Sequence, residues 1–220
     1  MSIRCWLIAY ARAATWHVGT SGSDDFTEIQ FAVDAAADGD TILIGPGQYD
    51  TFHPFTAPAW TEEVIVGINN DNLVFIGSGM DETIVGTTDP YYPDYEQPKG
   101  FCNVDGYSAV IKNMTLQHVA TNVYWWHGKL EVSNCRIKCD GGAYSGLTLW
   151  TDEAVIKDCE FFFSRSPFGI ILYTPAQNSL IQDCVFTGRA TAIAAAWSPN
   201  ARVISCVFNN VGVGVQFDFG

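Results

Sequence analysis

Hydrophobic and polar positions repeat along the second half of the chain. One phrase runs apolar, apolar, variable, Asn or Asp, sulfur residue, variable, apolar. Its sulfur residues are Met114, Cys135, Cys159, Cys184 and Cys206, so the intervals are 21, 24, 25 and 22 residues. The copies are VIKNMTL from Val110, EVSNCRI from Glu131, VIKDCEF from Val155, LIQDCVF from Leu180 and, one residue shorter, VISCVF from Val203. A repeat of this length is typical of solenoids.

A second phrase lies between the copies of the first. It reads GLTLW from Gly146, GIILYT from Gly169, TAIAAAW from Thr191 and GVGVQF from Gly212. The period is that of strands and not of helices. Alternation predicts one set of inward side chains, Leu147, Leu149, Ile170, Leu172, Ile193, Val213 and Val215. It predicts a second, outward set, Tyr124, Trp126, Thr148, Trp150, Ile171, Tyr173, Ala194 and Gln216.

These residues resemble the right-handed parallel β-helix repeat proteins of the pectin-lyase-like superfamily. The resemblance runs from about Trp16 to Gly220, and it implies an all-β, right-handed, single-stranded parallel β-helix with three strands per coil. Stacked coils would align the four cysteines in one interior ladder. Asn113, Asn134, Asp158 and Asp183 would form a second ladder at a tight turn, where Asn and Asp tolerate left-handed geometry. The resemblance indicates fold more than activity.

The N-terminal third predicts a cap for this solenoid. In WHVGTSGSDDFTEIQFAVDAAADGDTILIGPGQYD from Trp16, a short α-helix is expected between two strands. Thr27 and Gln30 have the spacing of a capping box, and Phe26 and Phe31 that of a hydrophobic staple. Ile29, Ala32, Val33 and Ala36 form an apolar stripe, which would cover the first coil.

Both chain ends carry information. Residues 1–14 combine two Arg residues, an apolar run and small residues, which fits a clipped secretory signal or, alternatively, an ordinary N-terminal strand. Residues 15–220 would form the β-helix domain. VGVGVQFDFG stops within a coil, so we expect either a fragment of a longer protein or an end-to-end contact with another chain. A secreted or cell-surface protein is the expectation, resting partly on the resemblance.

Composition narrows the partners. The 220 residues are 48% hydrophobic and carry a net charge of −13, with a pI near 4.4. Such a charge argues against nucleic-acid or anionic-membrane binding. No cofactor is required by the sequence, although Ca²⁺ could bind carboxylates such as Asp89, Asp94 and Glu96. The ladder cysteines are expected to be structural thiols, because parallel Cβ vectors do not favour a disulfide.

In enzymes of the resembling fold, the substrate groove usually runs along one parallel sheet, which the resemblance places on the second phrase. Trp126, Trp150, Tyr173 and Trp197 are therefore candidate saccharide-binding residues, since sugar rings stack on flat apolar faces. The alternative is that these aromatic rings pack on one another or beneath loops.

Catalytic candidates follow from the chemistry of polysaccharide cleavage. Asp152 and Glu153, directly after Trp150, could supply the two carboxylates of a hydrolase, and they could equally belong to a solvated turn. Arg165 and Arg189 precede successive groove strands and could serve a lyase or bind an acidic sugar. The Arg-Ile-Lys string at Arg136 resembles one motif of pectin-degrading hydrolases, but the other motifs of that family are missing.

Two functions remain open from the sequence. The first is a secreted carbohydrate-binding or carbohydrate-active protein, either a polysaccharide lyase or a glycoside hydrolase, that acts on an extracellular, acidic polysaccharide. The second is a non-catalytic adhesion or spacer module of a larger protein.

Overall fold

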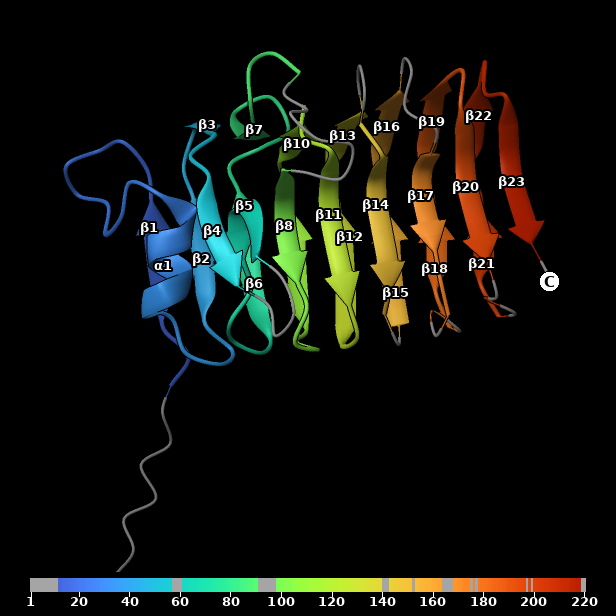
Figure 1. Ribbon diagram of the computed structural model, residues 1–220. Coiled ribbons are helices and arrows are strands. Elements are labelled where there is room, and N and C mark those ends of the chain that lie inside the picture. Colours follow the sequence, from blue (N-terminus) through green and yellow to red (C-terminus); the bar gives the residue numbers. More distant parts are fainter. Residues whose placement is uncertain are drawn as a thin grey trace, which may run out of the picture.

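The computed structural model describes residues 12–56, 61–90, 98–139, 143–151, 153–163, 168–174, 176, 178–196, 198 and 200–218. In Figure 1 these residues form a solenoid whose axis runs from α1 to β23, with neighbouring strands side by side along it. Three sheets of eight, seven and eight strands run along the axis. The expected all-β parallel β-helix with a short N-terminal helix is thereby confirmed.

Each complete coil contributes one strand to each sheet, except that the first complete coil adds two antiparallel strands, His53–Thr56 and Thr61–Gly67, to the third sheet. The first sheet contains β1 (Thr15–Val18), β2 (Thr41–Ile44), β6 (Leu73–Gly77), β9 (Ala109–Lys112), β12 (Lys129–Ser133), β15 (Glu153–Lys157), β18 (Leu180–Gln182) and β21 (Arg202–Ile204). The second contains β3 (Gly47–Tyr49), β7 (Thr83–Gly86), β10 (Thr115–Gln117), β13 (Arg136–Cys139), β16 (Glu160–Phe163), β19 (Val185–Gly188) and β22 (Val207–Asn209). The third contains β4 (His53–Thr56), β5 (Thr61–Gly67), β8 (Lys99–Asn103), β11 (Thr121–Trp126), β14 (Ser145–Trp150), β17 (Phe168–Leu172), β20 (Thr191–Ala196) and β23 (Val213–Asp218).

The turn between the first and second sheets repeats in every coil of the C-terminal half. Asn113, Asn134, Asp158 and Asp183 all have positive φ, from 50° to 61°. Ser205, with φ 53°, occupies the same place in the last coil, so the last phrase is not shortened but carries Ser instead of Asp. The predicted Asn/Asp ladder is confirmed, and its role is conformational because these short polar residues tolerate left-handed backbone.

The cysteine ladder lies directly inside this turn. Cys135, Cys159 and Cys184 are buried free thiols, and Cys206 in the last coil is half-buried. Each thiol donates to the carbonyl two residues earlier, for example Cys159 to Lys157 at 3.1 Å. Burial raises the pKa of Cys135 to about 12. The expectation of structural thiols agrees with this geometry, because each sulfur fills core space and provides a donor for a carbonyl oxygen at the turn.

The third sheet departs from strict alternation near the start of its strands. A Cβ atom added to Gly146 would lie 3.0 Å from Cys139 Sγ, and one added to Gly169 would lie 3.2 Å from a Phe163 ring carbon. Both positions therefore face the core, as do the next residues, Leu147 and Ile170. Two successive inward positions shift the alternation by one residue. Val213 consequently lies outside the core at 42% exposure, and its prediction as an inward residue is wrong.

The helix α1 (Ile29–Ala35) covers the N-terminal end as expected, with Ile29, Ala32 and Val33 buried in the main core. The predicted details at its start are wrong. The N-cap is Glu28, which makes no side-chain capping bond, and Phe31 is 47% exposed. Gln30 instead exchanges two hydrogen bonds with the backbone of Gly67, which ties the helix to β5. Tertiary contacts thus replace the local capping box.

Asp40 fastens the first strand to the solenoid. Its buried carboxylate accepts the backbone N–H groups of Ala14 and Ala37 and the indole N–H of Trp16, at 2.6–3.0 Å. Burial alone would raise the pKa of Asp40, but these three donors outweigh it and hold the pKa below its ordinary value.

Candidate functional site

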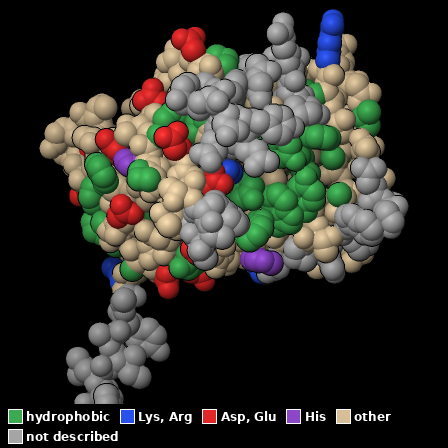
Figure 2. All heavy atoms as spheres, in the orientation of Figure 1, with side chains coloured by type: hydrophobic (Ala, Val, Ile, Leu, Met, Phe, Trp, Pro, Cys, Tyr) green, Lys and Arg blue, Asp and Glu red, His purple; other side chains and the backbone are tan. Residues whose placement is uncertain are grey.

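Aromatic side chains gather on the outer face of the third sheet. Tyr124 and Trp126 point outward from β11, Trp150 ends β14, and Tyr173 follows β17 directly. All four are half-buried, whereas Trp125 between the first two is fully buried in the core. Figure 2 shows the corresponding face, with a hydrophobic patch in its middle. The predicted outward orientation of these four residues is confirmed.

The rings pack on one another along the solenoid axis. Trp150 and Tyr173 are stacked, with ring centroids 4.3 Å apart and an interplanar angle of 7°. Trp126 approaches Trp150 edge-on at 6.1 Å, and Tyr124 is tilted toward Trp150 at 5.4 Å. The alternative of mutual stacking therefore describes these contacts, and the Trp150 and Tyr173 faces that meet each other are not available to a ligand.

Tyr144 turns this patch into a pocket. Tyr144 directly precedes β14, and its hydroxyl lies 3.1 Å from the hydroxyl of Tyr173, which follows the neighbouring strand β17. Ser145 and Thr148 are fully buried and hydrogen-bonded to each other on the outer side of β14. The resulting pocket has a volume of about 200 Å³ and is lined by Lys99, Thr121, Tyr124, Tyr144, Trp150 and Tyr173.

A buried ion pair supports one side of the pocket. Lys99 Nζ lies 2.6 Å from Glu62 Oε2, and the two side chains are only 3% and 11% exposed. The ammonium also lies 4.7 Å from the centroid of the Tyr124 ring, within cation–π distance. Next to this pair, Val64, Cys102 and Val104 form a small hydrophobic cluster with Phe55 and Tyr124. The pocket therefore combines aromatic surfaces, hydroxyl groups and a cation whose charge Glu62 compensates.

The catalytic candidates do not gather at this pocket in the described part of the chain. Glu153 begins β15 on the first sheet, where its carboxylate is 2.9 Å from Lys129 Nζ and holds the pKa of that lysine above its ordinary value. Arg189 is exposed in the turn before β20, at the end of the third sheet opposite Trp150 and Tyr173. Asp152, Arg165 and Trp197 lie outside the described residues.

A larger groove, of about 400 Å³, follows the outer face of the first sheet. Val74, Val110 and Val155 contribute to its mainly aliphatic lining, and Lys129 and Glu153 lie at its rim. It offers no aromatic ring to a ligand among its lining residues. Each of its charged residues is held in an ion pair, Lys129 with Glu153 and Glu131 with Lys157, so the groove provides fewer specific contacts than the smaller pocket.

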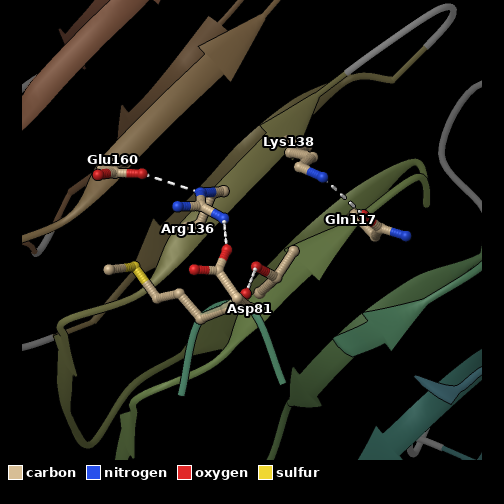
Figure 3. A network of polar contacts seen from close by, with 7 residues as sticks. Asp81, Gln117, Arg136, Lys138 and Glu160 are labelled. Atoms are coloured by element: carbon tan, nitrogen blue, oxygen red, sulfur yellow. Dashed lines mark hydrogen bonds and ion pairs between the residues drawn. The ribbon is translucent and has the colours of Figure 1, made fainter. Parts of the chain in front are cut away.

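Arg136 and Lys138 of the Arg-Ile-Lys string lie on the outer face of the second sheet, whereas Ile137 between them is buried in the core. Figure 3 shows Arg136 between the carboxylates of Asp81 and Glu160, and Lys138 directed at Gln117. Arg136 Nε donates to Glu160 at 2.8 Å, and both carboxylates raise the pKa of the guanidinium. Together these contacts join four coils, those of β7, β10, β13 and β16, which gives Arg136 and Lys138 a structural role.

The calcium expectation is only partly placed by the structure. Asp89 is exposed, while Asp94 and Glu96 lie outside the described residues. Within the described ranges, no group of three or more His, Cys, Asp or Glu residues is arranged to hold a metal ion.

Sequence reasoning missed Lys99, Glu62, Thr121 and Tyr144. Lys99 and Glu62 are separated by 37 positions and meet only because β5 and β8 are neighbours in the third sheet. Lys99 could have been found from the sequence, because it is followed by Gly100 and Phe101, a strand-like segment that lies one coil before the strand of Thr121. Tyr144 precedes GLTLW directly and could have been grouped with the aromatic residues.

Comparison with known proteins gives no family assignment: neither the family models nor the curated proteins searched contain a match to this chain. Among the described residues, no helix combines the length and apolar character needed to cross a membrane.

Proposed function

We propose that this protein binds saccharides at the pocket on the outer face of the third sheet. The observation that carries the proposal is the lining itself: tyrosine and tryptophan rings beside hydroxyl groups around a compensated ammonium. A sugar ring presents apolar C–H groups on its faces and hydroxyls on its edge, so it needs both kinds of partner at once.

The solenoid supports this proposal by fixing the pocket on rigid elements. Lys99, Thr121, Tyr124 and Trp150 all lie within strands that are paired on both sides, and Tyr173 follows such a strand directly. Side chains held by regular strands stay close to one geometry, which reduces the entropy lost when a ligand binds.

The proposal also covers the source of the saccharide, the location of the protein and the question of catalysis. The resemblance to pectin-lyase-like β-helix proteins favours an extracellular polysaccharide as the source of the sugar, and a secreted or cell-surface location fits the acidic composition. Catalysis by a lyase or hydrolase would need an acid and a base at the pocket. The catalytic candidates Glu153 and Arg189 lie elsewhere, and the charged groups at the pocket, Lys99 and Glu62, are held in a buried ion pair, so we propose binding.

An adhesion or spacer module is the second candidate. Its support is the last described coil, where β21, β22 and β23 each pair with one described strand and where Val207, Val213 and Phe217 are exposed. Strand edges and apolar side chains of this kind can pair with a further coil.

Isothermal titration calorimetry with a panel of neutral and acidic oligosaccharides tests the binding proposal. We expect saturable binding that is lost in Trp150→Ala, because this change removes the ring that contacts Tyr124, Trp126 and Tyr173. Phe162→Ala is the matched control, since Phe162 is an exposed aromatic residue on the second sheet. Equal affinity of the wild type and Trp150→Ala, or no binding of any saccharide, would refute the proposal.

A further inference from the structure

We infer that the pocket selects a single uncharged sugar ring, so that its natural ligand is a neutral saccharide and not an acidic one. This inference rests on the proposed function and specifies its ligand. It also departs from the acidic polysaccharide expected from the sequence.

The charges at the pocket lead to this conclusion. Lys99 is the cation among the described lining residues, and its ammonium is already 2.6 Å from the Glu62 carboxylate. A ligand carboxylate approaching Lys99 would therefore meet Glu62 as well, and the two negative charges would repel each other in a poorly hydrated site. The lining offers no second cation, within the described residues, to offset this repulsion.

The charge of the whole molecule acts in the same direction. A net charge of −13 gives a negative potential that slows the approach of a polyanion at low ionic strength. An uncharged sugar experiences neither effect. Its hydroxyls can exchange hydrogen bonds with the hydroxyl-bearing side chains of Thr121, Tyr124, Tyr144 and Tyr173, which line the same space.

The size of the pocket limits how much of the ligand enters. Its volume of about 200 Å³ is below the roughly 300–1,000 Å³ typical of pockets that enclose drug-sized molecules. Tyr144 and Tyr173 meet through their hydroxyls at 3.1 Å and close one side of the space. One sugar ring is therefore the unit that the pocket encloses, and additional rings of a chain would lie outside it.

Calorimetric titration with matched pairs of sugars tests the inference. Each pair consists of a neutral methyl hexoside and the uronate of the same configuration, so that the two differ only in the carboxylate. We expect the best neutral glycoside to bind at least about tenfold more tightly than its uronate, with an affinity that changes little between about 0.05 and 0.5 M NaCl. Neutral oligosaccharides longer than two units should bind about as tightly as the single ring.

The variant Glu62→Gln tests directly whether the charge of Glu62 causes the preference for a neutral sugar. This change retains an oxygen acceptor for Lys99 and removes the negative charge, so the preference for the neutral sugar should decrease by about tenfold or reverse. Glu131→Gln is the control, because Glu131 is paired with Lys157 on the first sheet, away from this pocket. If Glu62→Gln does not fold, the wild-type comparison of neutral and uronate ligands still decides.

The outcomes separate the two levels of the argument. Tighter, salt-dependent binding of the uronate by the wild type overturns the inference and leaves saccharide binding intact. Affinity that rises steadily with chain length overturns the single-ring part. Absence of binding to every sugar overturns the proposed function itself and the inference with it.

Discussion

The Lys99–Glu62 pair provides a direct test of how the third sheet holds the pocket. Replacing Lys99 with Met removes the cation but leaves the Glu62 carboxylate only 11% exposed, without its partner at 2.6 Å. Breaking a buried pair in this way costs about 3–5 kcal/mol of unfolding free energy, because the remaining charge keeps its desolvation penalty. We expect Lys99→Met to lose stability in this range.

The double variant Lys99→Met/Glu62→Leu should behave differently. Both charges are then absent, and the new side chains can extend the hydrophobic cluster formed by Val64, Cys102 and Val104. The remaining loss is the cation–π contact with Tyr124, which contributes about 2 kcal/mol for a desolvated cation. The double variant should therefore unfold within about 2 kcal/mol of the wild type.

Urea unfolding followed by circular dichroism measures both quantities in a thermodynamic cycle. The half-exposed pair of Lys157 and Glu131, with a distance of 3.0 Å, is the matched control, and its disruption should change stability by less than about 1 kcal/mol. The reasoning is refuted if Lys99→Met loses less than the control, or if the double variant is as unstable as the single one.

Three further predictions concern the scaffold. Asp40→Asn should lower the unfolding free energy by about 1.5–3 kcal/mol at neutral pH, because the three donors of Asp40 bond to a charged acceptor. Since the pKa of Asp40 is depressed in the folded state, this stabilisation is complete above about pH 4 and is lost as the pH falls through the folded pKa. The wild type and the variant should therefore converge in stability in acid, and Asp50→Asn is the control. Phe186→Ala should lower the unfolding free energy by about 3–5 kcal/mol in the same urea assay, because the buried Phe186 ring is stacked between Phe161 and Phe208, with ring centroids 4.6 and 5.3 Å away. Phe162→Ala should lower it much less, and similar losses for both variants would contradict the role of stacking. The end-to-end contact remains a prediction, and sedimentation velocity of this 220-residue chain should show concentration-dependent association. Val213→Lys should weaken this association, whereas Phe31→Lys, at the opposite end of the solenoid, should not. A monomer at all concentrations would argue against the contact.

The fold could be predicted because its signal repeats. Five copies of one phrase place a sulfur residue after a left-handed turn, and every copy reports the same local geometry. The wrong prediction for Val213 arose from an inward glycine that repeats in the third sheet, and the wrong helix cap arose where the sequence has only one instance to interpret. The capping box at Thr27 and Gln30 was plausible locally, but Gln30 finds a better partner in the backbone of Gly67, 37 positions away.

The site was only partly predictable for the same reason. Trp126, Trp150 and Tyr173 follow from alternation along strands, which is a local property. The presence of Lys99, Glu62 and Tyr144 at the pocket depends on contacts between side chains of different coils, which no local pattern describes. Glu153 illustrates the converse, because it follows Trp150 by only three positions and yet lies around a corner, on another sheet. Adjacency in sequence does not give adjacency on the surface of a coil.

The left-handed turn described above also explains how coils of unequal length stay aligned. The spacing between successive sulfur residues varies from 21 to 25, yet the turn residue and the adjacent thiol occupy equivalent places in each coil. This turn therefore keeps the coils in register at one corner of the solenoid, and differences in coil length are accommodated at the other corners. Insertions and deletions there can change the rim of the outer faces without disturbing the core. A scaffold of this kind separates variation in coil length from the packing that stabilises the core.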